Sequence, residues 1–364
     1  MKLQIIFRIS LFLGAFATMA LSNAVVPVLN SIASDPAIQG AVYSAYFLGA
    51  FLMVFPAGWM SDRVGRTPLV RAGLCGTLIA AAVLWLSYPD PTAAVLLRFA
   101  EGLFTGMFVS AAMAFVNSAA DHRKLAGGFV ALMNIGMVAG LVVSGWLAAW
   151  QAYAGVLVFG ILTGVSVLLS LGPADETPAL QTVLPVAEVT EIAVYHKWLW
   201  AALFVFCGTT GVVISAYPEL SGSSAEMNGV ITALMSVATA VFVYAASRMR
   251  TADSLSVVRG AGIFLGVSVP IVLVHPAGMI FVGAAFGVIT AAILNYLAET
   301  KKPQGVMNGM FNMTQYAGMA ALPFAAGLLV LPVGYVAVFL IVAVLNAAVG
   351  LLVVRCPCYV HHIQ

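Results

Sequence analysis

Charged residues are scarce in this chain: Asp, Glu, Lys and Arg make up 8% of the 364 residues, whereas hydrophobic residues make up 62%. Soluble domains are about half apolar and about a quarter charged, so water is not the main solvent of this fold. The net charge of +2 is small, and the basic residues are scattered. This pattern excludes the basic patch by which a protein binds nucleic acid.

Cysteine is also rare, with four residues. Cys75 and Cys207 lie inside apolar runs, and no disulfide framework follows from the spacing. Cys356 and Cys358 precede two histidines near the C-terminus, but no other cluster completes a metal site there. The sequence also lacks a Ser-His-Asp set, a phosphate-binding loop and a soluble nucleotide-binding domain. We therefore predict neither an enzyme nor an ATP-driven pump, and we expect no cofactor and no metal.

Long apolar runs, by contrast, are abundant. A helix that spans the hydrocarbon core needs about 20 apolar residues, because it rises about 1.5 Å per residue across about 30 Å. Runs this long exclude the strands of a membrane barrel, which alternate in polarity over about ten residues. The sequence predicts an all-α membrane protein with twelve transmembrane helices, at 5–28, 39–58, 69–88, 92–114, 125–149, 153–172, 198–217, 229–248, 255–273, 277–297, 306–330 and 334–354.

The first run has an alternative interpretation. Lys2 and Arg8 lie near its start, as in a secretory signal peptide whose apolar core would end near Ala20. We predict a retained first helix instead, because the run is long enough to span and its removal would leave eleven helices.

The basic residues predict the orientation. If the N-terminus is cytoplasmic, the predicted outer loops near Asp35, Asp90, Gln151, Glu219, His275 and Pro332 contain no Lys or Arg. This agreement with the positive-inside rule predicts a multi-pass protein of the cytoplasmic membrane with both termini in the cytoplasm. Arg98, within the fourth run, is the one basic residue left over from the inner set. That set is Lys2, Arg8, Arg63, Arg66, Arg71, Arg123, Lys124, Lys197, Arg248, Arg250, Arg259, Lys301, Lys302 and Arg355.

The chain divides into two related halves. A weakly apolar stretch at 173–197 separates residues 1–172 from residues 198–364, and we interpret it as a cytoplasmic linker between two six-helix bundles. At an offset of 178 residues, Asn134 aligns with Asn312 and Gly140 with Gly318, so the fifth and eleventh runs resemble copies. The alternative to an internal duplication is that Gly and Asn coincide by chance in apolar helices. Duplicated halves are common in secondary transporters, which bind their solute between the halves.

A short turn between the second and third runs carries the clearest motif, Gly58-Trp-Met-Ser-Asp62-Arg63-Val-Gly65-Arg66-Thr67. Gly65 can adopt the positive φ of a tight turn, and Asp62 can accept hydrogen bonds from a helix N-terminus. Arg63 and Arg66 can pair with carboxylates or lipid phosphates. A simple positive-inside anchor would explain the arginines but not Asp62 or the glycine spacing.

This segment resembles the signature loop of the major facilitator superfamily, with Thr67 where the family usually has Arg or Lys. Asn23-Ala-Val-Val-Pro27 and Tyr43-Ser-Ala-Tyr-Phe-Leu-Gly49 are similar to the first two helices of its drug and metabolite exporter branch. The resemblance implies twelve helices in two pseudo-symmetric bundles, with the loop as a latch on the outward-facing state. By analogy, Asp62 should meet the start of the eleventh helix near Asn308 and Gly309.

Two further segments resemble family motifs. Arg98 and Glu101 in the fourth run stand three residues apart, on one helical face, and can form a salt bridge. Charges at membrane depth are functional candidates, and the resemblance implies a part for Arg98 in proton coupling or cavity polarity; a self-neutralising structural pair is the alternative. The fifth run resembles the antiporter motif, but Leu141 and Ser144 depart from it, and small residues four apart also serve helix packing.

Few other polar residues lie within the runs. We interpret Asn23, Tyr43, Tyr46, Asn134, Asn295, Asn312, Gln315 and Tyr316 as candidates to contact solute or to join helices. Glu101 is the one acid within these spans and so the one candidate carboxylate for binding and releasing protons.

The sequence favours a monomeric secondary transporter that works by alternating access and contacts a small-molecule substrate, membrane lipids and, if coupled, protons. Proton-coupled efflux of a small organic solute is the leading hypothesis. An uptake carrier or facilitator for a metabolite such as a sugar or organic ion is the first alternative, favoured by Leu141 and the scarcity of buried acids. A membrane sensor or scaffold that does not transport is the second.

Overall fold

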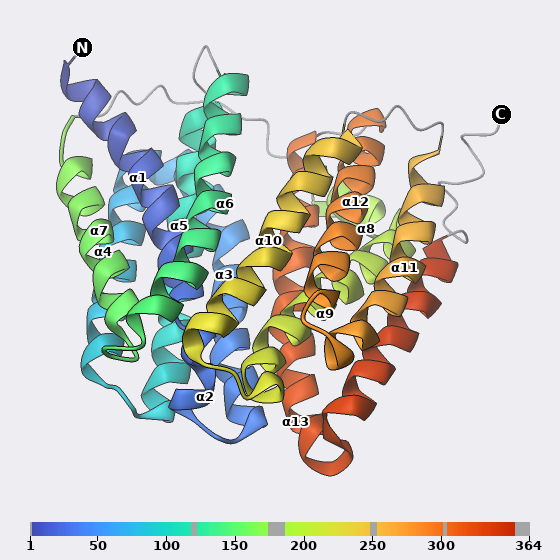
Figure 1. Ribbon diagram of the computed structural model, residues 1–364. Coiled ribbons are helices and arrows are strands. Elements are labelled where there is room, and N and C mark those ends of the chain that lie inside the picture. Colours follow the sequence, from blue (N-terminus) through green and yellow to red (C-terminus); the bar gives the residue numbers. More distant parts are fainter. Residues whose placement is uncertain (1, 118–121, 174–185, 248–252, 301–303, 354–364) are drawn as a thin grey trace.

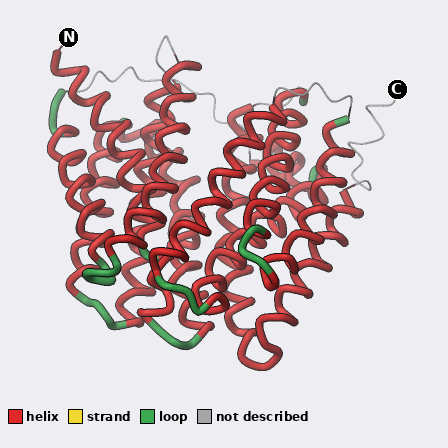
Figure 2. Tube along the Cα trace, viewed as in Figure 1, coloured by secondary structure: helices red, strands yellow, loops and turns green. Residues whose placement is uncertain are grey.

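The computed structural model describes residues 2–117, 122–173, 186–247, 253–300 and 304–353, and these contain helices and no strand (Figure 2). The Cys356 and Cys358 cluster therefore lies outside the described residues. The helices are α1 (Lys2–Ala24), the short η1 (Val26–Val28), α2 (Leu29–Ile32), α3 (Pro36–Val64), α4 (Arg66–Leu86), α5 (Pro91–Asn117), α6 (His122–Leu147), α7 (Ala154–Ser170), α8 (Val186–Tyr195), α9 (Lys197–Ser221), α10 (Ala225–Ser247), α11 (Ser254–Val274), α12 (Gly278–Glu299) and α13 (Gln304–Leu352).

The described parts of all twelve predicted runs lie mostly on helices, which confirms the predicted fold class. Within the described residues, ten helices are long and apolar enough to cross a membrane, and the apolar α7 is shorter, with 17 residues. The last of the ten, α13, holds the eleventh and twelfth runs. These two runs are separated at Gly334, whose φ of 81° and ψ of 164° are not helical. A glycine tolerates this conformation because it has no Cβ.

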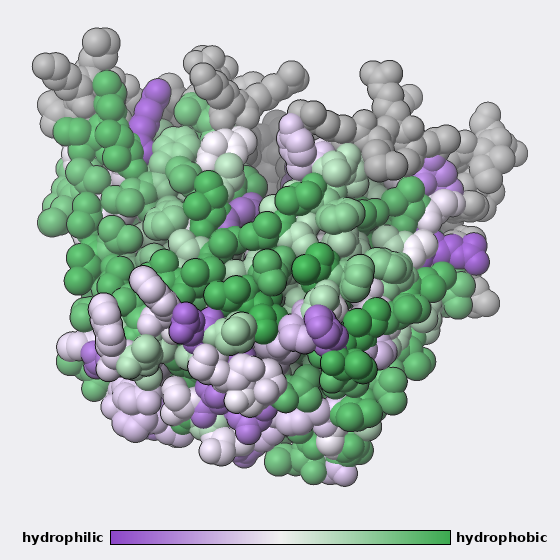
Figure 3. Space-filling model, viewed as in Figure 1, coloured by the Kyte–Doolittle hydropathy of each residue, from purple (hydrophilic) through white to green (hydrophobic). Residues whose placement is uncertain are grey.

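The helices have two distinct ends. We call the end that carries the start of α1 and the turn between α3 and α4 the basic end. Its basic residues with described side chains include Arg8, Arg63, Arg66, Arg71, Lys197 and Arg259. The opposite end carries the turns near Asp35, Asp90 and His275 (Figure 1). Apolar side chains cover the middle of the visible face, and hydrophilic ones gather towards the opposite end (Figure 3). This distribution is that of a multi-pass membrane protein.

The helices pack in two groups. In the first, α3 and α4 pack on α5, while α1 packs on α6 and α7. In the second, α9 packs on α13, α10 on α12, and α11 on both α12 and α13. The two groups contact each other chiefly through α3 with α13 and α6 with α10. The stretch predicted as a linker contains the ten-residue helix α8. The division into domains at 173–197 stays a prediction.

The contacts between the groups concentrate near the opposite end. A Cβ atom added at Gly40 of α3 would lie 2.6 Å from the Pro323 carbonyl oxygen of α13, and one at Gly229 of α10 would lie 2.3 Å from the Leu141 carbonyl oxygen of α6. The Gln39 side-chain amide also donates a 3.3 Å hydrogen bond to the Glu219 carboxylate. The two groups are therefore joined closely at this end.

The basic end is arranged differently. A Cβ atom added at Gly58 of α3, or at Gly309 of α13, would meet no other element within 4 Å. The backbones of these helices thus leave room around both positions. The side chain of Asp62 lies outside the described residues, so its expected contact near Asn308 and Gly309 stays a prediction.

Candidate functional site

Two charged side chains of α5 are buried together. Arg98 is 1% exposed and Glu101 is 0% exposed. The Arg98 Nη1 donates to Glu101 Oε2 at 2.7 Å, so the pair predicted from the spacing of three residues is formed. Arg98 stands seven residues after Pro91, about 10 Å along the helix from the opposite end. Burying two charges is costly unless they are paired and hydrogen-bonded, and each charge here has the other as its partner.

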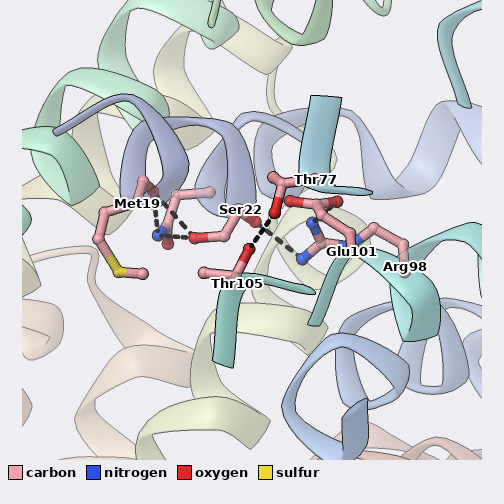
Figure 4. Close-up of polar contacts among 7 residues, drawn as sticks. Met19, Ser22, Thr77, Arg98, Glu101 and Thr105 are labelled. Carbon is pink, nitrogen blue, oxygen red and sulfur yellow. Dashed lines mark hydrogen bonds and ion pairs between the residues drawn. The ribbon is translucent and has the colours of Figure 1, made fainter. Parts of the chain in front are cut away.

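The neighbouring helices hold Arg98 at two further places. Its Nη2 donates a 2.8 Å hydrogen bond to the backbone carbonyl of Ser22, close to the end of α1 (Figure 4). Its guanidinium carbon lies 4.6 Å from the centre of the Tyr46 ring of α3, within the range of a cation–π contact. Arg98 thus ties α5 to both α1 and α3.

Asn23 lies beside this contact. Its side-chain amide donates to the Met19 carbonyl at 3.0 Å and to Ser22 Oγ at 3.1 Å. These bonds fix the end of α1 whose Ser22 carbonyl receives Arg98. Asn23 therefore lies one residue from a group that holds the ion pair.

An aromatic cluster extends from the ion pair towards α13. The ring of Phe47 lies 5.0 Å from that of Tyr43 and 5.1 Å from that of Tyr46, centre to centre. It also lies 6.3 Å from the ring of Tyr316, across the contact between the two helix groups. Three of the predicted cavity residues, Tyr43, Tyr46 and Tyr316, are thus brought together, and Phe47 joins them.

Part of the ion pair has no partner. In the part of the chain that the structure describes, Glu101 Oε1 and Arg98 Nε are buried and make no hydrogen bond. A carboxylate oxygen without a donor is an available proton acceptor, and a free guanidinium N–H is an available donor. Nearby, Thr77 and Thr105 share a 3.2 Å hydrogen bond between α4 and α5 (Figure 4). The pair therefore retains one buried acceptor and one buried donor without partners among the described residues.

The remaining predicted cavity residues differ in how far they are buried. Asn134 is exposed on α6, where its amide donates to the Val130 carbonyl at 2.8 Å. Asn312 is exposed on α13, and Gln315 and Asn295 are half-buried. Their part in binding solute stays a prediction.

The predicted latch lies at the turn between α3 and α4. Gly65 joins the two helices with φ 96° and ψ 156°, so the positive φ expected from the sequence is present. Arg66 is buried at 7% exposure, whereas Arg63 is exposed. Gly58 and Asp62 lie in the last turns of α3. The helix and turn geometry is thus compatible with the motif, and the latch function stays a prediction.

The segment of α6 that resembles the antiporter motif serves helix packing. A Cβ added at Gly136 would lie 2.3 Å from the Phe16 carbonyl oxygen, and one at Gly140 would lie 2.2 Å from that of Ala20. Both carbonyls belong to α1, so the glycines allow α1 and α6 to pack at backbone distance. Leu141 is fully buried, and its carbonyl faces Gly229 of α10.

Comparison with known proteins identifies the family. The family model of the Major Facilitator Superfamily matches residues 9–323. The chain belongs to the major facilitator superfamily. Proteins of this superfamily are membrane transporters that bind small molecules, and the fold of this chain agrees with its membership.

Relatives within the superfamily match part of their length. The tetracycline resistance protein, class C, of Escherichia coli is 33% identical over 148 residues, which cover 38% of this chain and 35% of that protein. The tetracycline resistance protein, class G, of Vibrio anguillarum is 29% identical over 161 residues, which cover 40% of this chain and 39% of that protein. The matches thus span well under half the length of these relatives.

Among solved structures, the likeness in fold extends over almost the whole chain. The nucleoside transporter NupG superimposes with a TM-score of 0.76 at 16% identity, covering 98% of this chain and 99% of that one. At this identity the likeness shows the fold alone.

Proposed function

We propose that this superfamily member exports a small organic solute across the cytoplasmic membrane in exchange for protons, by alternating access. The observation that carries the proposal is the buried Arg98–Glu101 pair, in which one carboxylate oxygen and one guanidinium N–H have no partner among the described residues. The names of the tetracycline resistance relatives support export. The positive-inside pattern supports a cytoplasmic basic end with both termini inside, and we propose that the transporter works as a monomer.

The charge of the pair would couple solute to protons. With Glu101 ionised, the pair is neutral; when Glu101 is protonated, Arg98 is left with an unbalanced positive charge in a buried site. An uncompensated buried charge is costly, so protonation favours a rearrangement around Arg98. Because Arg98 also bonds the Ser22 carbonyl and contacts Tyr46, such a rearrangement reaches α1 and α3.

Alternating access requires the two helix groups to separate at the opposite end, where they are joined closely. In the proposed cycle, the closely packed opposite end opens as the basic end closes. The Gln39–Glu219 hydrogen bond and the Gly40–Pro323 contact between α3, α9 and α13 would break in that step. Closure of the basic end would bring the predicted latch at Asp62 towards α13.

Flux in inverted membrane vesicles tests the proposal, with tetracycline as the first probe. We expect uptake that requires an acidic interior and stops when a protonophore collapses the gradient. Glu101→Gln keeps the size of the side chain but removes its charge, so gradient-driven uptake should fall to background. Glu299→Gln, which changes an exposed acid at the end of α12, is the matched control and should transport normally.

Two outcomes would favour another function. Flux of the probe that is the same with and without the gradient would contradict proton exchange and favour the facilitator. If a panel of small solutes gives no flux, and Asp62→Asn changes no measured property, the scaffold or sensor is favoured.

A further inference from the structure

A cavity of about 490 Å³ lies between α1 and α6 near the basic end. Arg8, Ile9, Phe12 and Phe16 of α1 and Leu125 and Leu132 of α6 contribute to its lining. It is an open hollow rather than an enclosed pocket, and its lining is apolar apart from Arg8. Its volume falls in the range of small-molecule sites, about 300–1,000 Å³.

One face of α1 joins this cavity to the buried pair. Residues three or four apart lie on one helical face, so Arg8, Phe12, Phe16, Met19 and Asn23 form a continuous stripe. From Arg8 to Asn23 this stripe is about 22 Å long. Asn23 bonds Ser22 Oγ, and the Ser22 carbonyl receives Arg98. The cavity and the proposed coupling site thus lie at the two ends of one face of α1.

The cavity carries an unbalanced positive charge. Arg8 is exposed and makes no hydrogen bond or ion pair among the described residues. Among the residues that the structure describes, no acidic side chain lines the cavity. At the other end of the stripe, Arg98 is neutralised by Glu101. The stripe therefore has a net charge of one positive, at the cavity, beside aromatic and aliphatic side chains.

We propose that this cavity receives small hydrophobic organic anions, which narrows the substrate class of the transport function proposed above. Arg8 binds the carboxylate or similar anionic group, because a guanidinium has several donors in a fixed plane that matches two oxygens. Phe12 and Phe16 contact the apolar body, which favours planar and ring-bearing molecules. Organic cations are repelled by Arg8, and neutral analogues lack the charge-assisted bond.

Calorimetric binding of 2-naphthoate to the full-length protein in phosphatidylcholine nanodiscs tests this proposal. We expect 2-naphthoate to bind, and 2-naphthalenemethanol, which has the same rings without the charge, to bind at least about tenfold more weakly, the size of one charge-assisted hydrogen bond. Arg8→Gln should weaken naphthoate binding by a similar factor, whereas Arg8→Lys should retain part of it. Arg259→Gln, which removes an exposed arginine of α11 away from the cavity, is the control and should bind like the unmodified chain.

Equal affinity for the two naphthalene compounds, or an unchanged affinity in Arg8→Gln, would overturn the proposal. A phospholipid headgroup is the competing occupant of Arg8. If phosphatidylglycerol in the nanodisc raises the thermal stability only when Arg8 is present, and 2-naphthoate does not bind, the site belongs to the lipid and the proposal is wrong. Binding is measured without a pH gradient, so a failure of proton-coupled flux would leave this result standing, and the reverse also holds.

Discussion

Arg98→Ala is expected to destabilise the protein by about 3–5 kcal/mol, the cost of leaving a buried charge without its partner. Glu101 is 0% exposed, and Arg98 provides its hydrogen bond at 2.7 Å. The substitution also removes the bond to the Ser22 carbonyl, which joins α5 to α1. Thermal unfolding of the purified protein in detergent, followed by its intrinsic fluorescence, measures the loss.

The double variant Arg98→Met with Glu101→Leu separates charge from packing. Replacing both partners of a buried ion pair by apolar residues of similar size is often neutral or stabilising, so most of the lost stability should return. Proton-coupled flux should remain absent, because the titrating carboxyl is gone. If Arg98→Ala is as stable as the unmodified chain, Glu101 finds another partner or stays protonated. That result would contradict a stabilising role of the pair.

Gly102→Val is expected to prevent folding or to lower the yield of folded protein sharply. A Cβ at this position would lie 1.9 Å from the Tyr46 carbonyl oxygen of α3, and that oxygen belongs to a backbone within a helix. Nearby, a Cβ at Gly49 would lie 2.2 Å from the Phe99 carbonyl oxygen of α5. Overpacking by side-chain atoms alone costs about 1–3 kcal/mol, and a clash with backbone leaves fewer ways to relax. Size-exclusion chromatography of the fluorescently tagged protein measures the folded fraction.

Gly260→Ala is the matched control for this prediction. Gly260 lies on α11, and a Cβ there would meet nothing within 4 Å. Alanine favours helix over glycine by about 1 kcal/mol in soluble helices, so this variant should be as stable as the unmodified chain or slightly more so. A normal yield of Gly102→Val would mean that α3 and α5 do not approach as the structure has them.

The sequence predicts the helices well because hydrocarbon leaves the chain few choices. A run of about 20 apolar residues has to satisfy its backbone hydrogen bonds internally, and a helix does so. The same signal is absent from short helices outside the apolar runs, so α8 was missed. The helix α8 has ten residues in a stretch with several acids, so it lacks the long apolar signal.

The site was predicted in part. The Arg98–Glu101 pair follows from spacing on a single helix, which a sequence reveals directly. The Ser22 contact was missed, because a backbone carbonyl is an acceptor at every position and has no sequence signature. Phe47 was missed because one more phenylalanine in an apolar run carries no distinct signal. An amide such as Asn134 can face the predicted solute cavity or another surface. Which of these it faces depends on how the helices pack, and a single run does not determine that.

The central claim is that the two helix groups move about the buried pair, so that the basic and opposite ends open in turn. Double electron–electron resonance tests this claim most directly. The native cysteines of the protein are first replaced, and the protein is then placed in nanodiscs. One spin-label pair, at Val64 and Ser247, spans the basic end, and another, at Asp90 and His275, spans the opposite end; all four residues are exposed.

Alternating access through Glu101 predicts two distances at each end, with populations that shift in opposite directions between pH 5.5 and pH 8.5. Glu101→Gln should abolish the shift, because the carboxyl that titrates is absent. A single fixed distance at both ends at each pH, or ends that open and close together, would contradict the claim.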